Sequence, residues 1–312
     1  MDKSCKIGER KTFKKVLKSL VNDWQLYVLL LPGVLYLFIF SYIPMYGVQV
    51  AFKDFSSSSG IWGSKWVGFE HFLRFIKYPS FSKIIFNTLT LSLYTIATFP
   101  CAVIVALLLN ELDNDRFKKT VQMVSYAPHF ISTVVICGMI KLFFGRSNGL
   151  INNVIEILGG VRYDFLTDAD CFPHIYVWSG VWQGIGWNTI IYLAALSNVS
   201  AEMQEAARID GANRLQIVTH INLPTILPTV MTMLILSCGG VLSVGFEKVF
   251  LLQNSLNLDA SQVISTYVYE VGIGGAQFSY SSAIGLFNTI VNIIVLMIVN
   301  TISKKLSSVS IW

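Results

Sequence analysis

Apolar stretches of about 20 residues recur along this chain, and they limit its fold more than any other feature. They are expected at 25–45, 88–110, 121–142, 175–196, 225–244 and 283–302. Each is long enough to cross a bilayer as an α-helix, the form that bonds every backbone polar group internally. Hydrophobic residues make up 54% of the 312 residues and charged residues only 13%. The sequence therefore predicts an all-α integral membrane protein with six transmembrane helices.

The distribution of basic residues predicts the orientation of these helices. Of the 23 Lys and Arg residues, 14 lie in the N-terminal segment, the 111–119 turn, the 201–228 segment and the C-terminal tail, and 8 lie in the longer segments on the other side. Basic residues are enriched on the cytoplasmic side of membrane proteins. We therefore expect a multi-pass protein of the cytoplasmic membrane with both termini in the cytoplasm. The net charge of +5 is explained by this topology, without nucleic acid as a partner.

The segment from Ala201 to Pro228 is a polar interruption between two apolar stretches. Its sequence predicts two short helices joined by a turn. Gly211 can adopt the left-handed conformation that ends a helix, and Asn213 can cap the next helix. Pro224 suits the first turn of the membrane helix that follows.

This polar segment carries a family resemblance. The run EAARIDG at 205–211, followed by INLP at 221–224, resembles the EAA loop of permease subunits from binding-protein-dependent ABC importers. In that family the loop forms a cytoplasmic coupling helix that docks on the ATPase. The resemblance implies ATPase-coupling roles for Glu205, Ala206, Ala207, Arg208, Asp210 and Gly211.

The resemblance also implies a fold and a domain organisation. The expected fold is that of type I ABC importer permeases (MetI-like). The expected parts are a cytoplasmic basic N-terminus (1–24), the first transmembrane helix with an external interfacial segment (25–85), a permease core of five transmembrane helices (86–305) containing the coupling loop (201–224), and a cytoplasmic tail (306–312).

Further motifs are similar to those of the sugar-transporting branch, which includes the maltose permease and LplB-like polysaccharide permeases. They are LPG at 31–33, YIP at 42–44 and AIGLFN at 283–288. The segment after the first span is too short for the large external domain of the longer maltose permease subunit, so contacts made by that domain are not expected here.

By resemblance, the function is ATP-driven import of a carbohydrate, an oligosaccharide, by alternating access. The implied partners are a second, homologous permease subunit, two ATPase subunits, an external solute-binding lipoprotein and membrane lipid. ATP and Mg²⁺ are expected on the ATPase, since this chain lacks a Gly-x-x-x-x-Gly-Lys-Ser/Thr phosphate loop. It also lacks a Gly-x-Ser-x-Gly elbow and metal-ligand spacing, so we expect no enzyme activity, cofactor or metal in the chain itself.

Polar and aromatic residues inside the spans are candidates for the substrate path. Sugars need aromatic faces for stacking and amide or hydroxyl groups for hydrogen bonds. The candidates are Trp178, Trp182, Gln183, Asn188, Tyr192, Ser237, Asn288 and Asn292. Interface anchoring and helix–helix hydrogen bonding are the alternative roles for these residue types.

Two glycines and one proline predict details of helix packing. The Gly180-xxx-Gly184 spacing permits close packing of another helix, and Pro128 can kink the 121–142 span. The sequence leaves two other transport functions open, an ion-coupled secondary transporter and an ABC importer for a non-sugar solute. The near absence of ionisable residues inside the spans disfavours ion coupling.

Overall fold

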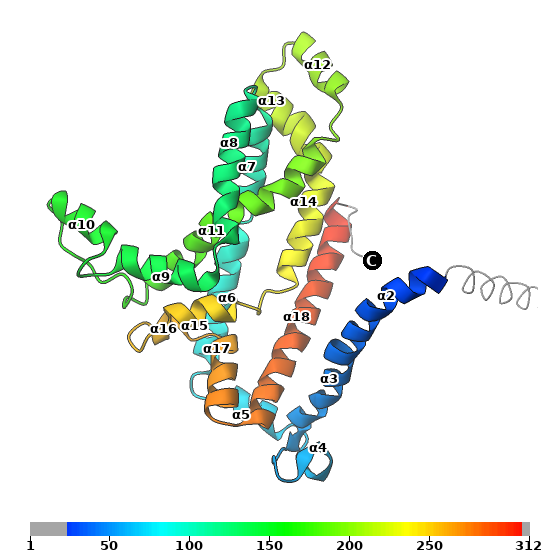
Figure 1. Ribbon diagram of the computed structural model, residues 1–312, viewed down its shortest axis with the longest axis vertical. Coiled ribbons are helices and arrows are strands. Elements are labelled where there is room, and N and C mark those ends of the chain that lie inside the picture. Colours follow the sequence, from blue (N-terminus) through cyan, green and yellow to red (C-terminus); the bar gives the residue numbers. More distant parts are fainter. Residues whose placement is uncertain (1–23, 308–312) are drawn as a thin grey trace, which may run out of the picture. The chain divides into compact units, whose positions relative to one another are not determined.

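The computed structural model describes residues 24–307, so the predicted cytoplasmic termini lie almost entirely outside the described residues. The chain divides into two units, residues 1–68 and 69–312. Helices dominate both units (Figure 1).

The first unit contains one long apolar helix and a small hairpin. The helix runs from Trp24 to Phe52, through α2 (Trp24–Leu37), a π-helical turn (Phe38–Tyr42), α3 (Ile43–Met45) and a 3₁₀ segment (Tyr46–Phe52). Strands β1 (Lys53–Asp54) and β2 (Lys65–Trp66) then pair antiparallel and flank the short helix α4 (Gly60–Gly63). The expectation of an all-α protein is therefore wrong in this segment, because the chain folds back on itself after Phe52.

The second unit begins with two helices before the predicted core. These are α5 (Glu70–Ile76) and α6 (Phe81–Ala97), and α6 continues after a short break into α7 (Pro100–Asn110). The span formed by α6 and α7 covers Phe81–Asn110 and starts earlier than the predicted 88. Its N-terminal end is fixed by Lys83, which forms a salt bridge with Asp259.

The predicted span at 121–142 is not one continuous helix. Helix α8 (Asp115–Tyr126) and a 3₁₀ turn (Ala127–Phe130) form one arm, and α9 (Thr133–Phe144) forms the other, bent by 100°. Pro128 lies inside the 3₁₀ turn, and the Ser132 hydroxyl accepts a hydrogen bond from the Val135 N–H to start α9. The proline predicted a kink, whereas the structure has a complete break.

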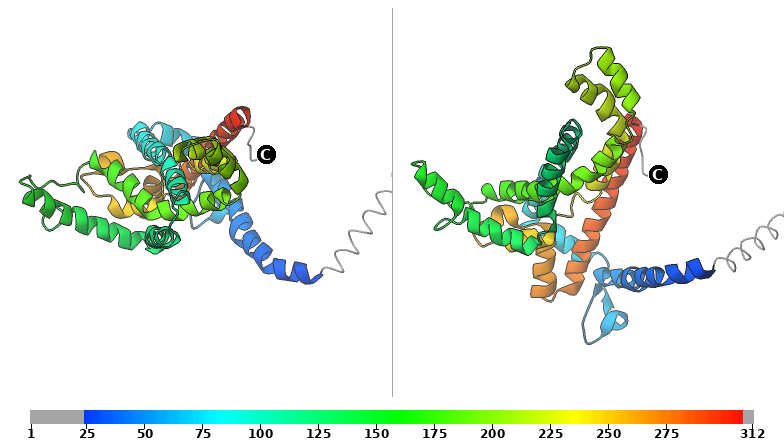
Figure 2. Two further views of the ribbon diagram at one scale, coloured as in Figure 1. Left: turned by 90° about the horizontal axis from the view of Figure 1, so that it is seen from above. Right: turned by 45° about the horizontal axis from the view of Figure 1, so that its top comes forward.

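The rest of the unit is built from α10 to α18. The bounds are α10 (Leu150–Ile157), α11 (Cys171–Leu196), α12 (Ala201–Ile209), α13 (Arg214–Ile217), α14 (Leu223–Cys238), α15 (Phe246–Leu252), α16 (Leu258–Ser261), α17 (Ile264–Tyr269) and α18 (Phe278–Ser307). Helices α9 and α10 extend to one side of this unit (Figure 2). Helices α12 and α13 lie at one end of it (Figure 1).

The predicted span at 225–244 differs at both ends. Helix α13 passes through a π-helical turn (Val218–Asn222) directly into α14, so the span covers Arg214–Cys238. Pro224 thus lies within a continuous helix, and the wider π turn before it accommodates the missing N–H. Residues 239–245 are not helical, because Gly239 and Gly240 end the helix and the Asn292 side chain binds the backbone N–H of Leu242.

Among residues 24–307, four helices are long and apolar enough to cross a membrane, or up to five if α8 and α9 form one bent span. Helix α11 has 26 residues and no Asp, Glu, Lys or Arg. It is not among these spans, because its polar uncharged residues lower its mean hydropathy. The protein is therefore a mostly helical membrane protein with four to five candidate spans.

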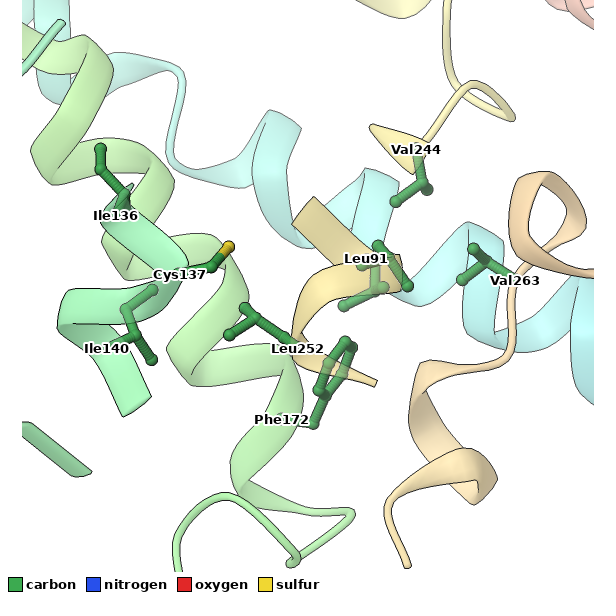
Figure 3. Packing of buried hydrophobic residues seen from close by; sticks show 9 residues of the cluster. Leu91, Ile136, Cys137, Ile140, Phe172, Val244, Leu252 and Val263 are labelled. Atoms are coloured by element: carbon green, nitrogen blue, oxygen red, sulfur yellow. The ribbon is translucent and has the colours of Figure 1, made fainter. Parts of the chain in front are cut away.

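Separate apolar clusters hold the second unit together. One cluster joins α6, α9, α11 and α15 through Leu91, Ile136, Phe172 and Leu252 (Figure 3). The next lies where α5, α17 and α18 meet, around Phe75, Tyr267 and Ile284, and a third joins α7 to α11 and α14.

Candidate functional site

A cavity of about 760 Å³ lies among α6, α7, α11, α14, the 239–245 segment and α15. This volume lies within the usual range for ligand sites. Apolar side chains form part of its wall, and aromatic residues line it at Phe99, Tyr176, Trp187 and Tyr192. The polar and charged lining residues are Ser92, Thr95, Thr98, Gln183, Asn188, Ser237, Ser243 and Lys248. The wall thus combines aromatic faces with amide and hydroxyl groups.

Four of the predicted path residues line this cavity, namely Gln183, Asn188, Tyr192 and Ser237. The Gln183 side chain donates a hydrogen bond to the backbone oxygen of Ile131 (3.1 Å), at the break between α8 and α9. Asn188 is exposed and makes no side-chain hydrogen bond within residues 24–307. Its amide is therefore available to a ligand.

Trp178, Trp182, Asn288 and Asn292 do not line the cavity. The indole N–H of Trp178 donates to the hydroxyl of Tyr94 (2.8 Å), which ties α11 to α6. The Trp182 side chain is half exposed, away from the cavity. The positions of Trp178 and Trp182 therefore fit the alternative role, anchoring of membrane helices, better than contact with a ligand.

The two asparagines of α18 differ from each other. Asn292 accepts from the backbone N–H of Leu242 (2.9 Å) and donates to the hydroxyl of Ser243 (2.9 Å). It therefore holds the non-helical 239–245 segment against α18. The buried Oδ1 atom of Asn288 has no hydrogen-bond partner among the described residues.

The sequence did not single out Lys248, the charged residue of the cavity wall. Its side chain is only 9% exposed. The Nζ atom donates to the backbone oxygen of Tyr176 (2.8 Å) and lies 5.0 Å from the centre of the Tyr176 ring. Burial lowers the pKa of Lys248 to about 8. The available signal for this site was Lys248 itself, which follows Glu247 in the otherwise apolar run FEKVFLL.

The 201–224 segment forms the two-helix structure that its sequence predicts. The Ser200 hydroxyl accepts from the backbone N–H of Met203 and starts α12. Gly211 has a φ of +84°, the left-handed conformation that ends the helix. Asn213 forms a capping box with Gln216 at the start of α13.

Glu205, Ala206, Arg208 and Asp210 are exposed on this segment, and Ala207 is half-buried. Glu205 takes part in no salt bridge within the described part of the chain. Apolar side chains, which the sequence prediction did not include, are also exposed here. Ile209 is 86% exposed and Leu215 is 71% exposed. The segment thus presents a mixed charged and apolar surface.

Buried polar groups connect this segment to α7. The Gln204 amide donates to the side-chain oxygen of Asn222 (2.8 Å), and the Asn222 amide donates to the carboxylate of Glu111 (3.0 Å). Asn222 is fully buried. Arg214 adds an exposed salt bridge to Asp113 (2.8 Å), which contributes little by itself. These contacts connect α12 and the start of α14 to the end of α7.

A polar-lined cavity among apolar helices, with a polar segment at one end, fits a membrane transport protein. The comparisons with known proteins agree. Residues 79–307 match the family of binding-protein-dependent transport system inner membrane components. The chain belongs to this family, and it is a permease subunit of a binding-protein-dependent ABC importer. It is a transport protein and not an enzyme.

Two relatives from Bacillus subtilis (strain 168) cover nearly the whole chain. Protein LplB is 44% identical over 92% of this chain and 91% of its own length. The polygalacturonan/rhamnogalacturonan transport system permease protein YteP is 40% identical over 98% of this chain and 96% of its own length.

Solved structures show the same fold. A chain of a bacterial ABC transporter involved in the import of the acidic polysaccharide alginate superimposes with a TM-score of 0.87, at 37% identity, over 94% of this chain and 99% of that chain. A second structure, of a bacterial alginate ABC transporter in complex with an alginate pentasaccharide-bound periplasmic protein, gives a TM-score of 0.86 with the same coverage and identity.

Proposed function

We propose that this subunit forms part of the path by which an oligosaccharide enters the cell. The observation that carries the proposal is the cavity of about 760 Å³, whose wall offers the amides of Gln183 and Asn188 beside the rings of Trp187 and Tyr192. Stacking faces and hydrogen-bonding groups are what a sugar requires. YteP and the alginate transporter are named for carbohydrate transport, which supports the same substrate class.

We also propose that α12 couples the path to a separate ATPase. Glu205, which forms no salt bridge among the described residues, offers a carboxylate to a basic residue of the ATPase. Ala206 permits close approach, and Ile209 and Leu215 offer apolar surface to a cleft. Exposed apolar side chains in a polar segment mark an interaction surface. Movement of the ATPase would then reach α7 through Gln204, Asn222 and Glu111.

The proposed assembly contains this subunit, a second homologous permease, two ATPase subunits that bind ATP and Mg²⁺, and an external solute-binding lipoprotein. We place α12 and both termini in the cytoplasm, following the distribution of basic residues. Helix α11 and the bent pair α8 and α9, together with the other four spans, would give the six crossings. Alternating access follows when ATP and substrate bind the inward-open and outward-open states with different affinity.

Uptake by the reconstituted importer tests this proposal. The complete complex in proteoliposomes, with ATP inside and loaded binding protein outside, is expected to accumulate a radiolabelled oligosaccharide such as tetragalacturonate. Asn188→Ala is expected to slow uptake several-fold, because it removes a cavity-facing amide. Asn153→Ala is the matched control, on α10 and outside the cavity. Failure of the wild-type complex to carry any oligosaccharide would refute the substrate class.

A further inference from the structure

Lys248 is a buried cation on the wall of the cavity, and no acidic side chain of residues 24–307 forms a salt bridge with it. Only 9% of its surface is exposed. None of the salt bridges among the described residues includes Lys248. The backbone oxygen of Tyr176 accepts a hydrogen bond from Nζ of Lys248 (2.8 Å), and the Tyr176 ring centre lies 5.0 Å from Nζ. These contacts use one N–H donor and do not neutralise the charge. An ammonium group has three donors, so others remain for a ligand.

Such an arrangement is costly unless a ligand uses it. Burying a charge without an opposite charge is unfavourable, and replacing it by an apolar residue of similar shape is often neutral or stabilising. Gly180 keeps space open beside the ammonium group, since a Cβ atom there would lie 3.3 Å from Nζ. Gly180 also lines the cavity. The structure therefore holds the cation in place and leaves its cavity side clear.

We propose that Lys248 recognises the carboxylate groups of an acidic, uronate-containing oligosaccharide as it passes through the cavity. This inference rests on the proposed function and names the substrate class more closely. A carboxylate binds an ammonium group by a charge-assisted hydrogen bond, which is about twice as strong as a neutral one. Neutral sugars would gain much less from the same group.

The position of Lys248 in the chain fits early contact with incoming substrate. Helix α14 starts beside α13, next to the proposed ATPase-docking segment, and ends at Cys238. Helix α15, which carries Lys248, follows after the 239–245 segment, at the far end of α14 (Figure 1). Lys248 therefore lies on the part of the cavity wall away from α12. A single cation binds carboxylates weakly enough to release each sugar unit in turn, as conduction requires.

The test compares an acid with its neutral ester in the complete importer. The probes are tetragalacturonate and its fully methyl-esterified form, each supplied with saturating binding protein to proteoliposomes. Lys248→Met removes the charge and keeps a similar volume. Lys141→Met, on α9 and outside the cavity, is the matched control. Lys248→Arg keeps the charge.

The expected result is at least a tenfold fall in the ratio of acid to ester uptake for Lys248→Met, with no change for Lys141→Met. If the wild-type importer carries only the acid, Lys248→Met is expected to remove at least nine-tenths of that uptake, and Lys248→Arg to retain more. The Lys248→Met complex should assemble and melt no lower than wild type, because Tyr176 lies inside α11 and its carbonyl keeps the helix hydrogen bond.

Two results would overturn the inference and leave the proposed function intact. They are an unchanged ratio of acid to ester uptake in Lys248→Met, which includes equal loss of both probes, and preference of the wild type for the ester. If the wild-type importer carries neither these probes nor any other oligosaccharide, the proposed function itself fails, and the inference fails with it.

Discussion

Helix α11 offers a matched pair of glycines for a test of its packing against α8. A Cβ atom added at Gly186 would lie 2.2 Å from the backbone oxygen of Ser125 on α8. At Gly184, one half-turn away, the same atom would meet only the Asn188 side chain of its own helix, at 3.4 Å. Gly186→Ala and Gly184→Ala therefore make the same chemical change in two different environments.

The magnitude follows from the overlap. Both substitutions gain about 1 kcal/mol of helix propensity. Gly186→Ala must also push α8 and α11 apart by about 1 Å or distort them, and overpacking of this kind costs about 1–3 kcal/mol or more. We expect the free energy of unfolding to be at least about 2 kcal/mol lower for Gly186→Ala than for Gly184→Ala, because a backbone atom cannot move aside as a side chain can.

Thermal unfolding of the purified complex in detergent, followed by tryptophan fluorescence, measures the difference. A loss of about 2 kcal/mol corresponds to about 4 °C or more in a unit of this size. Gly186→Ala should also assemble in lower yield. If Gly186→Ala melts at or above the temperature of Gly184→Ala, the close backbone approach of α8 and α11 is refuted.

Three further predictions concern function. Glu205→Lys should let ATP hydrolysis continue while uptake falls at least tenfold, and Glu70→Lys on α5 is the charge-reversal control. Normal uptake by the Glu205→Lys complex would contradict the coupling role. Asn222→Ala should lower both uptake and melting temperature, since it leaves the partly buried carboxylate of Glu111 without its amide donor, which costs about 1–3 kcal/mol. An unchanged variant would show that this connection is dispensable. Burial lowers the pKa of Lys248 to about 8, so its charge is lost as pH rises through 8. Uptake of an acidic oligosaccharide should therefore fall about tenfold by pH 9 in the wild type and should persist in Lys248→Arg. Cys137 and Tyr176 contact Lys248, and Glu247 is the acidic residue next to it in the sequence. Glu247→Gln is therefore the control for an effect of this carboxylate on the pKa of Lys248. Uptake that does not change with pH in the wild type would contradict the role of the charge.

The structure of the 201–224 segment was predictable because it is local. Gly211 and Asn213 specify a turn and a cap within a few residues, and the structure shows both. The family could likewise be inferred from the EAARIDG and INLP motifs, and the comparisons confirm it. Local backbone preferences and short motifs do not depend on how distant segments pack.

The residues of the cavity wall were predicted only in part, because residue type does not show which way a helix faces. Gln183 and Asn188 line the cavity, whereas Trp178 and Asn292 serve contacts between elements. The Gly180-xxx-Gly184 spacing permits close helix packing, but a Cβ at Gly180 would meet only the end of the Lys248 side chain, and a Cβ at Gly184 only Asn188 of its own helix. The close approach occurs at Gly186, whose partner is the backbone of a different helix.

The sequence alone determined that this is a helical membrane protein of the ABC permease family, because apolar length and local motifs are properties of the chain itself. Only the tertiary structure decided that the third predicted span breaks by 100°, that Asn292 supports a loop, and that Lys248 lies buried on the cavity wall. These features depend on segments that are 50 or more residues apart in the sequence, as Asn292 is from Leu242. Their positions are set by packing, which no local pattern records.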